Sequence, residues 1–269
     1  MEKAKPKISR RTVLKWGAAG VVAGTGIGLL GNEMEITQRT LRLPKWKADG
    51  FRIAQVSDVH VIDDAQLASA KAAIRVAMEA KPDLIVFTGD FVNHDKADQF
   101  ANIPKAFEEL ADARCPCLAI FGNHDHWCGA PEKVEEAAKK TKLNLLINRD
   151  VDVEGVRVVG LDSGRGGKPD YSLVTAKDAA STLVLLHEPD YLENFATPAG
   201  LVLSGHSHGG EMCLPGGIAV YTPRGSRRYR SGYYPNAPTP VYVNRGTATL
   251  GPARLYCPTE VCIFTLQSA

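Results

Sequence analysis

The chain has 269 residues, of which 44% are hydrophobic and 23% are charged. That balance excludes a disordered chain, and the length is sufficient for one large domain or two small ones with a buried core. Residues 1–30 hold six bases and one acid, so the remaining body is mildly acidic and is not expected to be a general nucleic-acid binder.

Residues 1–32 are predicted to be an export signal or an N-terminal anchor. A basic stretch precedes an uncharged, Gly-rich run from Trp16 to Leu30, which would rise only ~22 Å as a helix, less than a bilayer span needs. Arg10 and Arg11 stand just before that run, and this junction resembles the twin-arginine signal. We therefore expect export by the twin-arginine machinery to the periplasmic or other extracytoplasmic face of the membrane, with membrane association if the segment is not cleaved. The basic flank of an amphipathic surface helix is the alternative.

Residues 33–269 are predicted to form a single domain, in which strands alternate with helices at first. Apolar runs predict strands at 52–57, 84–88 and 117–121. Each is followed by a predicted helix, at 64–80, 103–111 and 131–140. Short strands dominate the rest, at 143–147, 156–161, 182–186, 201–204, 218–221, 241–244 and 261–266. An α/β half followed by a strand-rich half predicts two stacked sheets flanked by helices.

Five of these strand-like runs end in residues of the kinds that bind metals. They are Asp58 and His60, Asp90, Asn123-His124-Asp125, His187, and His206 with His208. Because ligands bind beyond the carboxyl ends of strands in α/β sheets, we expect these side chains to meet in one crevice. Histidine nitrogens with carboxylate and amide oxygens suit Mn, Zn or Fe. Seven of these residues, all except His124 and Asp125, are candidate ligands. Seven exceed what one tetrahedral ion needs, so we predict two divalent ions that share a ligand.

The order of these motifs, D-x-H, G-D, G-N-H-D, H and G-H-x-H, resembles the calcineurin-like metallophosphoesterase family over residues 51–266. The run at 205–210, with 242–246 downstream, is similar to its bacterial exported or membrane-associated phosphodiesterase branch. The resemblance implies a four-layer α/β/β/α sandwich. It also implies a metal-dependent phosphoric ester hydrolase, which cleaves phosphodiester or pyrophosphate bonds with a metal-activated hydroxide.

The resemblance assigns a role to each candidate residue. One ion would take Asp58, His60, Asp90 and His208. The second would take Asp90, Asn123, His187 and His206, so that Asp90 bridges the two ions. His124 would contact the scissile phosphate or protonate the leaving oxygen. Many family members place an Asp, which orients this histidine, where the present chain has Asn93. An amide stabilises an imidazolium less than a carboxylate does, so the acid role and the role as a phosphate hydrogen-bond donor both stay open.

Weaker features surround this pattern. The Gly164–Gly167 run is predicted to be a surface loop, because no helix with a phosphate-binding fingerprint follows it. His94 and His126 are expected to lie behind the ligands or in solvent. The six cysteines form no CxxC zinc pattern and are expected to be mainly small buried residues.

The segment 221–234 contains four Arg and four Tyr. In one interpretation it is a substrate loop, in which Arg227, Arg228 and Arg230 hold a second phosphate or headgroup. In the other it is a solvated basic loop that offsets the acidic body. The residues alone do not choose between the two.

Three other functions compete with a general phosphodiesterase. A metallo-β-lactamase-type hydrolase would carry H-x-H-x-D-H, which this sequence lacks. A non-catalytic metal-binding relative would have lost ligands, whereas every family ligand position is kept. A pyrophosphatase acting on a nucleotide-linked lipid sugar of the UDP-diacylglucosamine type is a specific variant, which export disfavours because such substrates are made in the cytoplasm. We expect a monomer that binds a phosphate-ester substrate and no specific nucleic acid.

Overall fold

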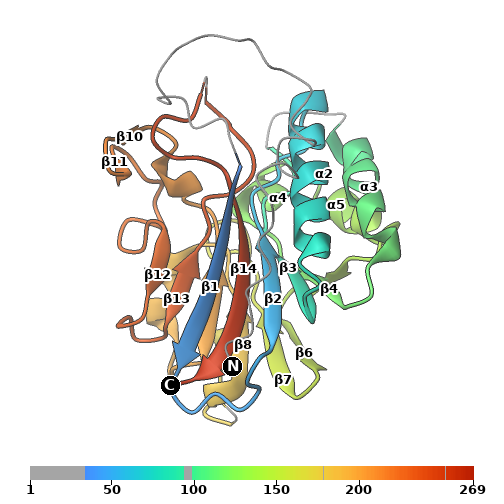
Figure 1. Ribbon diagram of the computed structural model, residues 1–269. Coiled ribbons are helices and arrows are strands. Elements are labelled where there is room, and N and C mark those ends of the chain that lie inside the picture. Colours follow the sequence, from blue (N-terminus) through green and yellow to red (C-terminus); the bar gives the residue numbers. More distant parts are fainter. Residues whose placement is uncertain (1–33, 94–98, 178, 252) are drawn as a thin grey trace, which may run out of the picture.

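The computed structural model describes residues 34–93, 99–177, 179–251 and 253–269. The predicted export signal and His94 therefore lie outside the described residues. Two six-stranded sheets are stacked, and α-helices cover the outer face of one of them (Figure 1). No helix in the described part of the chain is long and apolar enough to cross a membrane.

The first sheet is mixed and has the order β1-β14-β2-β3-β4-β5. Its strands are β1 (Glu35–Leu43), β14 (Glu260–Ser268), β2 (Arg52–Val56), β3 (Leu84–Phe87), β4 (Cys117–Ala119) and β5 (Asn144–Leu145). Strands β2 to β5 are parallel, whereas β14 is antiparallel to β2 and parallel to β1. The amino end of β1 therefore lies at the same edge as the carboxyl ends of β2, β3 and β4.

The second sheet has the order β12-β13-β9-β8-β7-β6. Its strands are β12 (Gly232–Tyr234), β13 (Val241–Val243), β9 (Leu201–Ser204), β8 (Thr182–Leu185), β7 (Val156–Gly160) and β6 (Arg149–Val153). The four central strands are parallel and the two edge strands are antiparallel to their neighbours. A separate antiparallel ribbon joins β10 (Cys213–Leu214) to β11 (Ile218–Ala219).

Helices α2 (Asp64–Glu79), α3 (Asn102–Phe107) and α5 (Pro131–Ala138) pack on the first sheet, while the short α4 (Asn123–Trp127) follows β4. Helix α2 begins where the Asp63 side chain accepts a hydrogen bond from the Gln66 backbone at 2.8 Å, a typical N-cap. Short 3-10 helices complete the described elements: Gln99–Ala101, Glu108–Asp112, Tyr171–Leu173, Ala179–Ser181, Pro189–Asn194 and His208–Gly210.

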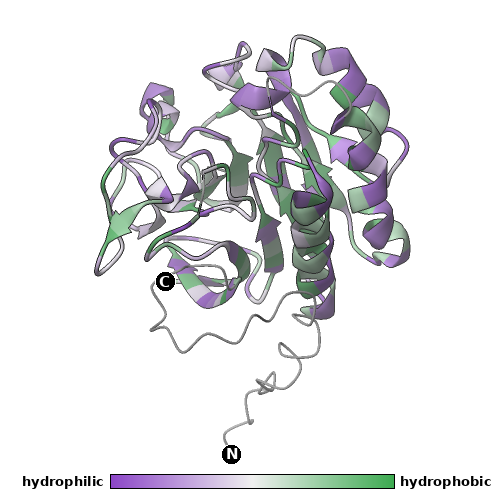
Figure 2. Cartoon of the chain, turned by 90° about the horizontal axis from the view of Figure 1, so that it is seen from above, coloured by the Kyte–Doolittle hydropathy of each residue, from purple (hydrophilic) through white to green (hydrophobic). Residues whose placement is uncertain are grey.

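The alternation of side chains along the strands builds separate cores on the two faces of each sheet. In β8, Leu183 and Leu185 enter the core between the sheets, whereas Val184 enters the core on the outer face. That outer face is covered, within the described residues, by 3-10 turns and loops rather than by α-helices. Figure 2 shows hydrophobic residues concentrated along the interior strands and hydrophilic ones on the outward turns of the helices.

The predicted fold class, two mixed sheets flanked by helices, is confirmed. It differs from the expected α/β/β/α layering in that, among the described residues, the fourth layer consists of 3-10 helices and loops. The helix predicted at 103–111 is α-helical only to Phe107 and continues as a 3-10 turn to Asp112. Strands β1, β6, β10 and β12 were not predicted. All six cysteines are free thiols, and four of them are buried: Cys117, Cys213, Cys257 and Cys262.

Candidate dimetal site

The strand ends bring all seven predicted ligands to one edge of the sandwich. Asp58 and His60 follow β2, Asp90 follows β3, Asn123 opens α4, His187 follows β8, and His206 and His208 follow β9. These residues include two groups, and within each group the ligand atoms lie within 4.8 Å of one another. The first group is Asp58, His60, Asp90 and His208, and the second is Asp90, His187 and His206. Asp90 belongs to both groups, as the bridging prediction requires.

The backbone at this edge is strained. Five of the seven residues have φ in the left-handed region that favours glycine: Asp58 (50°), His60 (36°), Asp90 (58°), His206 (68°) and His208 (49°). Such backbones persist where the surroundings impose them, and they are common at functional sites. Gly122 is required by close approach, since a Cβ there would collide with the carboxylate and the backbone N of Asp90.

Hydrogen bonds fix the orientation of two buried histidines. His60 Nδ1 lies 2.9 Å from the Val92 carbonyl, and His187 Nδ1 lies 2.6 Å from the Thr88 carbonyl. Each Nδ1 therefore carries the proton, which leaves Nε2 as a lone pair in the neutral ring. Both Nε2 atoms are buried without a hydrogen-bond partner, and they face Asp90 Oδ2 at 3.6 Å and 3.1 Å. Electron-rich atoms in this arrangement fit a bound cation.

Asn123 also fits a bound cation, because its Oδ1 is buried without a hydrogen-bond partner. An unpaired buried amide oxygen is costly unless an ion or water binds it. The site could therefore hold two divalent cations, one on each side of Asp90.

Burial sets the charge of the ligands. It lowers the pKa of His60 well below its usual value and that of His206 to about 3, so both rings are neutral. Burial alone would raise the pKa of Asp90, but His187 and His60 hold it well below its usual range. Burial alone would likewise lower the pKa of His187, but Asp90 raises it well above its usual value. A divalent cation held by His187 and Asp90 would require the neutral form of the His187 ring, with Nε2 as its ligand atom.

His206 and His208 are held by groups that the sequence did not reveal. His206 Nε2 lies 3.0 Å from the Arg224 carbonyl, which leaves Nδ1 for a ligand. His208 Nδ1 lies 3.4 Å from Glu211 Oε1, and its Nε2 lies 3.4 Å from Asp58 Oδ1. The fully buried Arg254 guanidinium donates to the His208 carbonyl at 3.1 Å. Glu211 and Arg254 therefore orient His208, as outer-shell partners of metal-binding histidines commonly do.

His124 lies beside the two clusters and is only partly buried. Its backbone N–H donates to Asp90 Oδ1 at 2.9 Å, which ties its position to that of the shared carboxylate. Its Nδ1 lies 2.8 Å from Asn93 Oδ1, and its ring centroid is 5.1 Å from that of His60. The amide in place of a family carboxylate is thus in direct contact with this imidazole.

Asp125 has a structural role that the sequence did not identify. Its buried carboxylate accepts hydrogen bonds from four backbone N–H groups, those of Gly122 (2.8 Å), Asp90 (2.9 Å), Phe91 (2.8 Å) and Val92 (3.2 Å). Burial, followed by the nearby Asp90, raises the pKa of this carboxyl to about 7. Asp125 joins the loops after β3 and β4, and so holds Asp90 and Asn123 in place.

The Gly164–Gly167 run is folded against the site rather than lying free on the surface. Glu188, next to His187 and fully buried, accepts hydrogen bonds from Ser163 Oγ at 2.6 Å and from the Gly164 backbone at 2.9 Å. The Arg165 guanidinium lies over the Trp127 ring at 4.8 Å, and that ring is 5.3 Å from the ring of His124. Arg165 and Trp127 therefore border the site.

His126 is partly buried, and its Nε2 contacts Asp162 Oδ1 at 2.6 Å. This hydrogen bond raises the pKa of His126. The contact links α4 to the loop that contains Gly164–Gly167.

The segment 221–234 is attached to the body by acids of one 3-10 turn. The Asp190 carboxylate accepts from the backbones of Arg227 (2.8 Å) and Arg228 (3.0 Å), and the Arg228 guanidinium pairs with Glu193 at 2.9 Å. In the described part of the chain, none of the guanidinium groups of Arg227, Arg228 and Arg230 hydrogen-bonds to a candidate metal ligand. The segment touches the ligands through the carbonyl of Arg224, which the substrate-loop prediction did not include.

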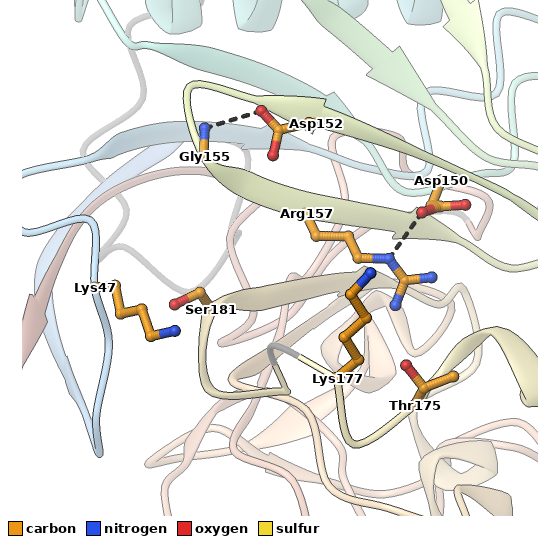
Figure 3. Close-up of a pocket in the computed structure, with 8 residues that line it drawn as sticks. All are labelled: Lys47, Asp150, Asp152, Gly155, Arg157, Thr175, Lys177 and Ser181. Atoms are coloured by element: carbon orange, nitrogen blue, oxygen red, sulfur yellow. Dashed lines mark hydrogen bonds and ion pairs between the residues drawn. The ribbon is translucent and has the colours of Figure 1, made fainter.

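A separate hollow lies at the opposite edge, by the amino ends of β7 and β8 (Figure 3). Its charged lining includes Lys47, Lys177 and Arg157, and the last of these pairs with Asp150 at 2.7 Å. It contains none of the seven candidate ligands, so the chemistry belongs to the other edge.

Comparisons with known proteins agree with this geometry. The family model described as calcineurin-like phosphoesterase matches residues 51–210. The chain is 34% identical to the uncharacterized metallophosphoesterase YkuE of Bacillus subtilis, over 97% of this chain and 99% of that one. It is 30% identical to the phosphodiesterase YaeI of Escherichia coli, over 96% and 99%. It is 27% identical to the UDP-2,3-diacylglucosamine pyrophosphatase LpxG of Chlamydia muridarum, over 86% and 89%.

The fold also matches a solved structure. A dimetal phosphatase from Danio rerio aligns with a TM-score of 0.51 and 12% identity, over 78% of this chain and 94% of that chain. At that identity the likeness shows the fold alone.

Proposed function

Because this chain belongs to the calcineurin-like phosphoesterase family and is a metal-dependent phosphoester hydrolase, we propose that it cleaves phosphodiester or pyrophosphate bonds with two divalent ions. The ions, Mn, Zn or Fe, would bind the two clusters with Asp90 between them. The observation that carries this proposal is the pair of buried, unpartnered Nε2 atoms of His60 and His187, which face one carboxylate oxygen of Asp90.

Two divalent ions at such a site activate water as a nucleophile and offset the charge of the phosphate. Asp58 and Asp90 supply two negative charges among otherwise neutral ligands, so the loaded site stays positive and attracts a phosphate ester. His124 stands next to this centre, with its ring oriented by Asn93. It would donate a proton to the leaving oxygen, or a hydrogen bond to the phosphate itself.

Two further parts of the proposal concern residues outside the clusters. We assign Arg227, Arg228 and Arg230 to a second phosphate or headgroup of a large substrate. The twin-arginine pair in the first 32 residues supports export and an extracytoplasmic location, with attachment to the membrane through that segment.

A nucleotide-linked lipid sugar is the second candidate substrate. It is favoured by the relative from Chlamydia muridarum, which is named for UDP-2,3-diacylglucosamine and covers 86% of this chain. Export argues against this substrate, so the phosphodiesterase remains the first proposal. A non-catalytic metal-binding protein is the remaining alternative.

The test is a hydrolysis panel on metal-stripped protein that is reloaded separately with Mn, Zn and Fe. The substrates are bis(nitrophenyl) phosphate, nitrophenyl phosphate and UDP-diacylglucosamine, and a His60→Ala variant is the control. We expect diester cleavage that requires metal and is lost in the control. Protein that binds two ions and cleaves none of the substrates would support the non-catalytic alternative instead.

A further inference from the structure

Six of the seven exposed large hydrophobic side chains in the described part of the chain lie on one surface. Five belong to the β10–β11 ribbon and its flanks: Met212 (46% exposed), Leu214 (54%), Ile218 (59%), Val220 (68%) and Tyr221 (69%). The sixth is Leu250, whose backbone N–H donates to Glu211, directly before the ribbon. We call these six residues the ribbon patch. Contiguous apolar surface of this kind marks an interaction site.

The register of the ribbon explains why the patch faces outward. Leu214 is paired with Ile218, and the Val220 backbone N–H donates to the Met212 carbonyl at 3.2 Å. Directly opposed residues and alternate residues share one face of a ribbon, so these four side chains lie together. The residues between them, Cys213 and Ala219, occupy the other face, where Cys213 is buried at 2% exposure. One face of the ribbon thus packs on the protein and the other is apolar and unpaired.

Both ends of the ribbon are attached to the candidate dimetal site. The chain enters it from His208 through two glycines, and Glu211, the last residue before the ribbon patch, contacts the His208 ring at 3.4 Å. The chain leaves it toward Arg224, whose carbonyl contacts the His206 ring at 3.0 Å. The patch therefore borders the site on the side of the second sheet.

The described chain begins at the same edge. β1 starts at Glu35, and the starts of β1 and of the ribbon lie at the same end of the molecule (Figure 1). Glu35 pairs with Arg245 at 2.8 Å, and Arg245 contacts the region of Gly209 next to His208. The 33 residues before Met34 include the uncharged run 16–30. The described chain therefore begins at the edge that carries both the candidate site and the ribbon patch.

We propose that the ribbon patch docks on a lipid bilayer, with the candidate dimetal site held against the headgroups. Charge favours lipid over a protein partner, because residues 212–224, which include five of the six patch residues, contain Arg224 and no acidic residue. Arg224 is exposed beside the patch, and Tyr221 is exposed within it. Basic and aromatic residues around an apolar surface suit anionic headgroups. The proposal goes beyond the hydrolase activity, and it holds whether or not that activity is as proposed.

The test places a fluorescent reporter on the ribbon of the full chain. Ile218→Trp reports from the patch, and Lys177→Trp, in the hollow at the opposite edge, is the matched control. Both are made with Trp16→Phe, so that the amino-terminal segment gives no signal. Vesicles of phosphatidylcholine and phosphatidylglycerol with brominated acyl chains quench indole that enters the apolar layer. We expect about twofold quenching of the added emission at position 218, and none at position 177, for a ribbon inserted to headgroup depth.

A second measurement covers the case in which the amino-terminal segment alone keeps the protein on vesicles. Replacing Leu214, Ile218 and Val220 together with Ser should weaken partitioning about ten- to a hundredfold, since each loses apolar contact with lipid. Hydrolysis of a soluble nitrophenyl ester should stay unchanged, which shows that the variant is folded. Vesicle-bound protein without quenching at position 218 overturns the proposal. So does a triple variant that partitions normally, or one that only converts a lipid-free oligomer into a monomer.

Discussion

Replacing Asn93 with Asp would restore a carboxylate beside His124. The Asn93 Oδ1 lies 2.8 Å from His124 Nδ1, so an aspartate of the same shape can make the same contact with a full charge. A neutral hydrogen bond contributes about 1 kcal/mol and one to a charged group about 1.5–3 kcal/mol. The protonated imidazole should therefore gain about 1 kcal/mol, which raises the equilibrium constant for protonating His124 about fivefold. The rate should rise by up to the same factor where the neutral ring otherwise predominates and the proton is transferred to the leaving oxygen.

The assay is kcat/KM for aryl phosphodiesters with a graded series of leaving groups. We expect the Asn93→Asp gain on the poorest leaving groups and none on nitrophenyl esters, which need little protonation. His124→Ala should keep both ions and lose about two orders of magnitude or more on poor leaving groups. In that background Asn93→Asp should have no effect, because the residue acts only through the imidazole.

The same series can refute the reasoning. A gain that survives in His124→Ala would show that the new carboxylate acts on the metals instead, so metal content is measured in every variant. An equal gain on all leaving groups would assign His124 to the phosphate rather than to the leaving oxygen. No gain at all would mean that the Asn93 contact does not orient the reacting group.

Three more predictions test other parts of the proposal. Asp90→Ala should lose both ions and nearly all activity, because this residue belongs to both clusters; elemental analysis that finds two ions per chain would remove the bridging assignment. Replacing residues 10–11 with two Lys should leave active, metal-loaded enzyme in the cytoplasm, and cell fractionation that finds normal export would exclude the twin-arginine signal. Replacing Arg227, Arg228 and Arg230 with Ala should lower kcat/KM roughly ten- to a hundredfold per lost contact on a large substrate, and leave a nitrophenyl ester unaffected; an equal fall on both would indicate damaged folding.

The strand ends were predictable because parallel strands place successive loops at one edge whatever lies between them. A run such as 182–186 therefore locates His187 near Asp90 without any knowledge of the intervening chain. Strand β1 was not predictable in the same way. It pairs with β14, with Glu35 opposite Glu260. Most of the sequence separates the two strands, and a local sequence pattern does not identify so distant a partner.

The hydrogen-bond partners of the buried carboxylates Asp125 and Glu188 could not be predicted from the sequence. Both stand next to predicted site residues, but Asp125 was not among the seven candidate ligands and Glu188 was given no role. The structure shows that each accepts backbone N–H groups from a neighbouring loop. Which donors surround a carboxylate depends on loop conformation, and loop conformation is not encoded in residue type alone.

The sequence made segment 221–234 a better candidate for substrate contact than Gly164–Gly167. The structure suggests the reverse, for the same reason. Gly164–Gly167 has no phosphate-binding fingerprint, yet its Gly164 backbone N–H donates to the buried Glu188. Arg165 consequently lies over Trp127, beside His124. Arg228, in the segment that looked more promising, instead pairs with Glu193. A motif reports local conformation, whereas the distance of a side chain from a reacting centre is set by tertiary contacts. Arg165 therefore borders the candidate metal ligands, whereas the proposed role of Arg228 concerns a part of the substrate beyond the scissile phosphate.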